Sequence, residues 1–223
     1  MLDRFLTYLP FMETTSRRSA NAPIRTTRIR SGTPTKSPLI FTRDLPGPMS
    51  MRRLCDMGIL IPLGHESAFL SSDARTLFGR AAIASALVPT GSAACASLAA
   101  WIWNGGTFPD TIDVISRSHY RAPIYGRLIR VYNRAVPPDH LRRMGRLLVT
   151  SPLRTACDLA CDEPSDQDAD IRSTILKLLH RNKLTPSFCL KMLDDNPRWP
   201  GHAIGVAIFT DMKATFDTWN DHD

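Results

Sequence analysis

Arginine side chains dominate one stretch of the sequence, and their chemistry is the first clue to function. Residues 117–154 contain nine arginines, no lysine and one acidic residue, Asp139. A guanidinium group binds phosphate through two parallel hydrogen bonds and stacks on flat rings, whereas a lysine ammonium acts as a point charge. Histidine and tyrosine side chains are interleaved with these arginines, which is typical of surfaces that contact nucleic acid. A solvated arginine-rich face without a ligand is an equally good interpretation.

A predicted strand carries the densest part of this stretch. Residues 128–133 alternate between polar and aliphatic side chains, so Arg130, Tyr132 and, just beyond the strand, Arg134 are expected to share one face. Crowded positive charge costs self-repulsion, which favours a polyanionic or acidic partner. We therefore predict a basic face in the C-terminal part of the chain. Its members are Arg130, Tyr132, Arg134, Arg142, Arg143, Arg146 and Arg154.

A helix is predicted to follow this arginine-rich stretch. Ser151 followed by proline is the pattern of a helix N-cap and first helical position. Spacing of four residues places Arg154 and Asp158 on one face, where we expect a surface ion pair. The same spacing places Cys157 and Cys161 on the inner side. No further Cys or His pair stands nearby at metal-ligand spacing, so we expect buried thiols and no metal site.

Catalytic signatures are sparse in this sequence. It contains no Gly-x-Ser-x-Gly motif, no phosphate-binding glycine loop and no His-Glu-x-x-His motif. A metal-dependent nuclease needs clustered carboxylates, but Asp110 lies about a hundred residues from the Asp211 and Lys213 pair. We expect no catalytic residue, no metal and no cofactor. A nuclease remains the least favoured of three functional hypotheses.

The charge of the whole chain also favours a polyanionic partner. The 223 residues carry 28 basic and 21 acidic side chains, a net charge of +7, and residues 163–223 are acidic. The positive excess therefore lies within residues 1–162. The longest apolar stretch, residues 93–103, is too short to cross a bilayer, and the first twelve residues do not resemble a signal peptide. Five scattered cysteines favour a reducing compartment, so we predict a cytoplasmic protein with no membrane partner.

The N-terminal part divides into an arm and a compact unit. Residues 1–37 are rich in Ser, Thr, Arg and Pro and predict a basic, flexible arm. Residues 38–72 predict a short helix, a tight turn, a helix over 49–57 and a hairpin of 59–63 with 67–70. This order is the outline of a winged helix-turn-helix. The residues expected to contact DNA are Thr42, Arg43, Ser50, Arg52, Arg53 and His65.

Residues 73–223 predict a second, mixed domain. Strands are expected where β-branched residues alternate, and helices where apolar residues recur every three or four positions. The expected strands are 112–115, 128–133 and 147–149, and the expected helices are 74–87, 92–103, one from 152, 171–184, a short one from 185 and 203–219.

Three stretches of this sequence resemble one known family. Residues 149–160 (VTSPLRTACDLA) and residues 130–139 (RVYNRAVPPD) are similar to the strand-to-helix segment and the arginine-rich strand of AbiEi-type antitoxins of the actinobacterial kind. Residues 41–45 (FTRDL), with residues 51–60 (MRRLCDMGIL), resemble the N-terminal winged helix of that family. The likeness extends over about residues 38–215.

This resemblance implies a protein with two functions. The winged helix would bind inverted repeats in the promoter of its own operon. The C-terminal domain would neutralise a nucleotidyltransferase-like toxin without a stable complex, the type IV arrangement. The Ser-His pair of the family is absent near Cys95 and Ser97, and a basic stretch replaces the helix expected before Phe41. That replacement leaves open whether the winged helix is complete.

We therefore predict an α+β protein, with a small N-terminal winged helix-turn-helix followed by a mixed α/β antitoxin-like domain. Its expected partners are duplex DNA and a nucleotidyltransferase-like toxin, and we expect toxin neutralisation to reside in residues 74–223. The alternative is a winged-helix transcriptional regulator, or a decayed relative, without antitoxin activity. A nucleotidyltransferase-like gene beside this one would favour the first hypothesis.

Overall fold

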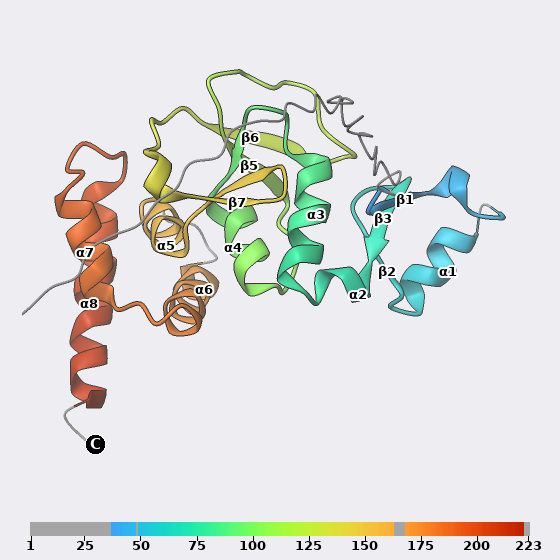
Figure 1. Ribbon diagram of the computed structural model, residues 1–223. Coiled ribbons are helices and arrows are strands. Elements are labelled where there is room, and N and C mark those ends of the chain that lie inside the picture. Colours follow the sequence, from blue (N-terminus) through green and yellow to red (C-terminus); the bar gives the residue numbers. More distant parts are fainter. Residues whose placement is uncertain (1–36, 48, 163–167, 221–223) are drawn as a thin grey trace, which may run out of the picture. The chain divides into compact units, whose positions relative to one another are not determined.

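The computed structural model describes residues 37–47, 49–162 and 168–220 (Figure 1). The predicted basic arm of residues 1–37 lies almost wholly outside this range. Eight α-helices and two sheets make up the described part of the chain, which confirms the α+β class.

The smaller sheet is formed by residues near the start of the described chain. Strands β1 (Leu39–Phe41), β2 (Leu60–Pro62) and β3 (Ser67–Leu70) are antiparallel in the order β1-β3-β2. Between β1 and β2 lie a 3-10 turn, η1 (Thr42–Asp44), and helix α1 (Ser50–Asp56). The predicted helix over 49–57 and the predicted hairpin are therefore confirmed. The short helix predicted from Thr42 is only a three-residue 3-10 turn, and β1 adds a strand that was not predicted.

Helix α1 is held on this sheet by one apolar face. Met51 is buried and packs in a small cluster with Leu60 of β2 and Ala68 of β3. The side chains of Arg52 and Arg53, which follow Met51 in the helix, are exposed. The helix therefore presents its arginines to solvent because its apolar stripe is used for packing.

The larger sheet has the strand order β6-β5-β4-β8-β7. Strands β5 (Thr111–Ile115) and β6 (Leu128–Tyr132) are parallel, and β7 (Leu141–Met144) and β8 (Leu147–Thr150) form an antiparallel hairpin. Strand β4 (Ala93–Ala94) joins the two pairs at the centre. The predicted strands near β5, β6 and β8 are confirmed.

Two strands of this sheet were not predicted. Residues 93–94 were expected to begin a helix over 92–103, but they pair with β5 and β8, and the helix starts at Ala96. Alanine carries no β-branch that would indicate a strand, so the pairing is imposed by the neighbouring strands. Strand β7 contains two consecutive arginines, which conceal its alternation.

Helices cover the large sheet and extend the chain beyond it. The helical elements after the small sheet are α2 (Ser71–Ala74), α3 (Leu77–Leu87), α4 (Ala96–Asn104), the 3-10 turn η2 (Pro138–His140), α5 (Pro152–Ala160), α6 (Asp168–Arg181), α7 (Pro186–Asp194) and α8 (His202–Asn220). Helices α7 and α8 run side by side after α6 (Figure 1).

One hydrophobic core joins the small sheet to the large one. Leu39, Leu63 and Phe69 of the small-sheet region share a buried cluster with α3, α4 and the large sheet. The Phe69 ring lies 5.9 Å from Trp101 and 5.7 Å from Phe108. The boundary predicted between residues 72 and 73 therefore does not coincide with a gap in the core. A fragment that begins at residue 74 would lose these packing partners.

A second buried cluster joins α5 to helices α6, α7 and α8. Cys157 of α5, Cys161 at the C-cap of α5 and Cys189 of α7 lie within it, fully or almost fully buried. Hydrogen bonding with Cys189, and next burial, raise the pKa of the Cys157 thiol, whereas burial is the main cause that raises the pKa of Cys161 to about 11. The prediction that Cys157 and Cys161 face inward is confirmed, and their raised pKa values make them poor nucleophiles.

Candidate functional site: an arginine–aspartate network and two exposed arginine groups

The predicted basic face begins on β6, opposite a buried carboxylate. Asp113 of β5 pairs in register with Arg130 of β6 and is fully buried. The Arg130 guanidinium donates from Nε to Asp113 Oδ1 at 2.9 Å and from Nη2 to Oδ2 at 2.8 Å. Asp113 also accepts hydrogen bonds from the Ser97 amide and the Thr111 hydroxyl. The hydrogen bond to Asp113 is the largest cause that raises the pKa of Arg130.

Tyr132 lies between two arginines of the same strand face. Its ring centroid is 5.1 Å from the guanidinium carbon of Arg130 and 4.7 Å from that of Arg134. Its hydroxyl donates to Asp162 Oδ2 at 2.7 Å, and Arg130 Nη2 lies 3.2 Å from the same oxygen. Burial is the largest cause that raises the pKa of Tyr132. The prediction that these three side chains share one face is confirmed.

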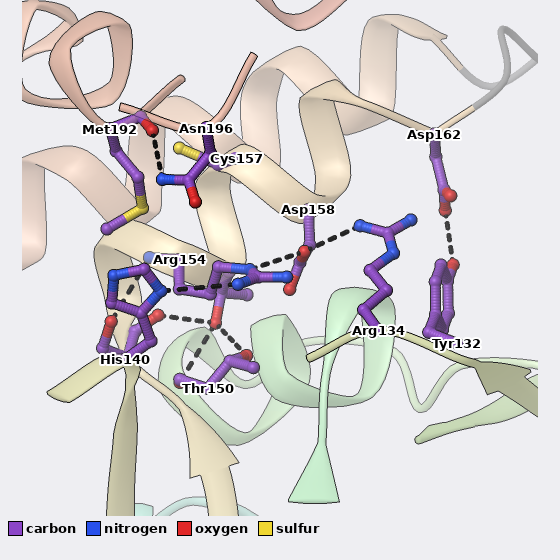
Figure 2. A network of polar contacts seen from close by, with 12 residues as sticks. Tyr132, Arg134, His140, Thr150, Arg154, Cys157, Asp158, Asp162, Met192 and Asn196 are labelled. Atoms are coloured by element: carbon purple, nitrogen blue, oxygen red, sulfur yellow. Dashed lines mark hydrogen bonds and ion pairs between the residues drawn. The ribbon is translucent and has the colours of Figure 1, made fainter. Parts of the chain in front are cut away.

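Asp158 of α5 connects this face to the helical region. Its Oδ1 accepts from Arg134 Nη1 at 3.0 Å and from Arg154 Nε at 2.9 Å. Arg154 is completely buried, and its guanidinium stacks 3.9 Å from the ring centroid of Trp199. Figure 2 shows Arg154 between His140 and Asp158, with Arg134 on the far side of Asp158.

The expected surface position of Arg154 and Asp158 is wrong. The pair forms at the predicted spacing, but the two side chains are 0% and 2% exposed. Every residue of α5 from Arg154 to Ala160 is buried, because α5 packs against α4, α6, α7 and α8. The polar face of this helix therefore packs against Arg134 and Trp199, whereas the sequence predicted that this face is exposed to solvent.

His140 of η2 completes this end of the network. Its Nδ1 lies 3.4 Å from Arg154 Nη1. Burial, and next the charge of Arg154, lower the pKa of His140. Burial raises the pKa of Asp158, although Arg154 and Arg134 both act to lower it. Within the described residues, Arg154 Nη2 and Asp158 Oδ2 are buried without a hydrogen-bond partner.

The network balances its charges internally. It joins three arginines to three aspartates, so the part of the predicted basic face on β6 and α5 carries little net positive charge. Removing one partner of a buried ion pair strongly destabilises the folded state, because the other charge is left buried and unpaired. We conclude that Arg130, Arg134 and Arg154 hold elements together, whereas the sequence suggested a patch of unpaired charge.

The other predicted members of the basic face lie in the β7–β8 hairpin and are exposed. Arg142 Nη1 donates to the carbonyl oxygens of Asp139 and Leu141, and Arg146 Nε lies 3.3 Å from Ser85 Oγ. The Arg143 side chain forms no hydrogen bond or ion pair with any described residue, although its backbone lies opposite Leu148 in the hairpin. Strand β7 is an edge of the sheet, so these side chains stand beside backbone groups that are open to solvent.

The residues predicted to contact DNA lie on the small-sheet region. Arg43, Arg52, Arg53 and His65 are exposed, whereas Thr42 and Ser50 are half-buried. Arg43 stacks over Phe41 at 4.7 Å, and Arg52 lies 4.0 Å from the exposed Asp56. Thr42 Oγ1 is buried and has no hydrogen-bond partner in the described chain.

A groove of about 860 Å³ lies beside the network, between α4, the start of β5 and α6. Two arginines that line this groove already have partners, because Arg130 pairs with Asp113 and Arg181 donates to the Asn104 carbonyl.

In the described ranges, no three His, Cys, Asp or Glu residues are placed to hold a metal ion. Asp110 pairs with Arg127, and Asp211 pairs with Arg172.

Sequence reasoning predicted Asp158 as the partner of Arg154 but missed Asp113 and Asp162, the two acidic partners of Arg130. Asp113 is the one charged residue in the strand Thr111–Ile115, and a lone carboxylate among apolar residues is a usable signal of a buried pair. His140 and Trp199 gave no local signal. Among the described helices, none has the length and apolar character needed to cross a membrane.

Comparisons with protein-family models, with curated proteins and with solved structures find no match to this chain.

Proposed function

We propose that the protein is a cytoplasmic, non-catalytic DNA-binding regulator of the antitoxin type. In this proposal the small-sheet region binds the promoter of its own operon, and the α+β part opposes a nucleotidyltransferase-like toxin. The resemblance of residues 38–215 to AbiEi-type antitoxins motivates the two roles. The positions of the exposed side chains support mainly the first role, DNA binding.

One observation carries the DNA-binding proposal. Helix α1 lies between β1 and β2, buries Met51 against the small sheet and exposes Arg52 and Arg53. His65 is exposed in the turn that connects β2 to β3. A helix with outward arginines beside an exposed hairpin turn is how a winged helix-turn-helix approaches the major groove and the flanking phosphates.

Binding to the duplex upstream of the gene tests this proposal. The double change Arg52→Ala with Arg53→Ala should weaken binding by about tenfold or more, because each arginine is expected to contact a base or a phosphate. A matched control, Lys191→Ala with Lys213→Ala, removes the same charge from exposed positions of α7 and α8. Equal affinity of both variants and the unchanged protein would refute the role of α1.

The antitoxin role is best tested on the β7–β8 hairpin. Reversing Arg130 and Arg134 would place new carboxylates against Asp113 and Asp158, so a loss of function would only report unfolding. Arg142, Arg143 and Arg146 are exposed, and their reversal to Glu should leave the fold intact. The full chain is used because its core includes residues before position 74.

In cells that carry the toxin gene, the unchanged protein should restore growth and the triple reversal should not. The control is the reversal of Lys183, Lys191 and Lys213 to Glu, which should still restore growth. Rescue by the hairpin variant would remove these arginines from toxin neutralisation.

The second candidate is a DNA-binding regulator without antitoxin activity. The internal neutralisation of Arg130, Arg134 and Arg154 favours it, since it accounts for much of the predicted basic face without a partner. Failure of the unchanged protein to restore growth, together with specific DNA binding, would support this second candidate.

A further inference from the structure

A tight turn of the large-sheet region lies directly against the turn between β2 and β3. The turn spans residues 124–127, where Ile124 and Arg127 exchange two backbone hydrogen bonds of 2.9 and 3.0 Å. Its two central residues have positive φ, 49° at Tyr125 and 82° at Gly126. Two successive residues of this kind are typical of a type I′ turn.

The backbones of the two turns meet at Gly64. A Cβ atom added to Gly64 would lie 2.5 Å from the carbonyl oxygen of Tyr125. A Cβ atom added to Gly126 would lie 3.6 Å from the Cα atom of Gly64. Gly64 is not among the residues with positive φ, so glycine is required there by the close approach of the other chain segment.

Arg127 adds a polar connection between the same two turns. Its Nε donates to the carbonyl oxygen of Leu63 at 2.9 Å, and its Nη1 lies 2.8 Å from Asp110 Oδ1. Its guanidinium carbon is 5.7 Å from the centroid of the Phe108 ring. The Phe41 and Tyr125 rings, 5.4 Å apart, provide an apolar contact beside it.

The β2–β3 turn depends on such support. Strands β2 and β3 have three and four residues, and the turn between them is closed by bonds from the Leu63 and Gly64 amides to the Ser67 carbonyl. A hairpin this short is marginal without contacts from outside. The turn at residues 124–127 supplies those contacts on the Leu63 and Gly64 side and leaves His65 exposed.

We infer that the turn of residues 124–127 positions the β2–β3 turn for DNA binding, with Arg127 as a positioning residue that acts through His65. This inference rests on the proposed DNA-binding function of the small-sheet region. It also means that the DNA-binding region is held in place by the large-sheet region, so the two are coupled mechanically at Gly64.

Two variants of the full-length protein break this contact in different ways. Gly64→Ala forces the two backbones apart, and Arg127→Ala removes the bond to Leu63. The controls are Gly47→Ala, where an added Cβ meets only Ser50 Oγ at 3.9 Å, and Asp110→Asn, which removes the ionic partner of Arg127 and leaves the bond to Leu63.

Amide hydrogen exchange over residues 61–67 is measured first, because it needs no DNA. Gly64→Ala and Arg127→Ala should exchange faster in this segment than the unchanged protein, and both controls should not. Unchanged exchange in both variants would overturn the inference, whether or not the protein binds DNA. An unchanged protein that fails to bind DNA would instead refute the proposed function.

Binding to the upstream duplex is the second readout. Arg127→Ala should weaken binding by about tenfold, but only where His65 is present, because coupled residues are not additive. In a His65→Ala background the effect of Arg127→Ala should therefore largely disappear. A purely structural role would give the same loss in both backgrounds, and that result would overturn the positioning role.

Discussion

The chain uses arginine in two contrasting environments. In the network around Asp158, guanidinium groups are paired with carboxylates, stacked on aromatic rings and partly or fully buried. On α1 and the β7–β8 hairpin, Arg53 and Arg143 are exposed and pair with no acidic residue in the described chain. Arginine density in the sequence does not separate these two environments. The presence or absence of an acidic partner does separate them. Substitutions of paired and unpaired arginines should therefore differ in their effect on stability.

The largest effect is expected where the ion pair is most buried. Arg154→Ala removes the stacking on Trp199 and leaves Asp158 with one cationic partner, Arg134. Breaking a buried pair from one side should lower the free energy of unfolding by about 3–5 kcal/mol. Urea denaturation measures this, with Arg143→Ala as the exposed control, for which a change below about 0.5 kcal/mol is expected. Similarly small changes in unfolding free energy for both variants would contradict the proposed difference between buried and exposed arginines.

A smaller effect is expected at the partly buried edge of the network. Tyr132→Phe keeps the ring between Arg130 and Arg134 and removes the hydroxyl bond to Asp162. The loss of one such bond should cost about 1 kcal/mol of unfolding free energy. Thermal and urea denaturation should agree on this value. A loss as large as that of Arg154→Ala would mean that the hydroxyl has a role beyond this bond.

A still smaller effect should appear in the pH dependence of stability. Burial and Arg154 lower the pKa of His140 below its unfolded value, so the folded state binds fewer protons than the unfolded state in that window. The contribution of His140 is therefore fully present above its unfolded pKa, near 6.5, and is lost as the pH falls toward its folded pKa. His140→Asn should flatten this part of the stability profile. An identical profile in the variant would show that other groups cause the dependence.

Local patterns predicted several parts of this network. Alternation along β6 placed Arg130, Tyr132 and Arg134 on one face, and the Ser151-Pro152 pattern located the start of α5. Ser151 Oγ accepts the Arg154 amide hydrogen bond, as expected of an N-cap. These features depend on residues a few positions apart, which is why the sequence alone was sufficient.

The environment of Arg154 could not be predicted in the same way. Spacing of four residues predicts that Arg154 meets Asp158, but it does not predict which helix face is covered. Trp199 covers Arg154 from the connection between α7 and α8, and Arg134 reaches Asp158 from beyond β6. Asp113 meets Arg130 only because β5 and β6 pair in that register. These contacts are long-range, and a single sequence does not indicate which residues they join.

DNA binding by the exposed arginines of α1 is the central proposal for this protein. A salt titration of binding to the upstream duplex tests it directly, since each phosphate contact adds about one unit to the slope of log affinity against log salt. We predict a shallower slope for Arg52→Ala with Arg53→Ala and an unchanged slope for Lys191→Ala with Lys213→Ala. Equal slopes for the unchanged protein and the α1 variant would contradict DNA binding by Arg52 and Arg53.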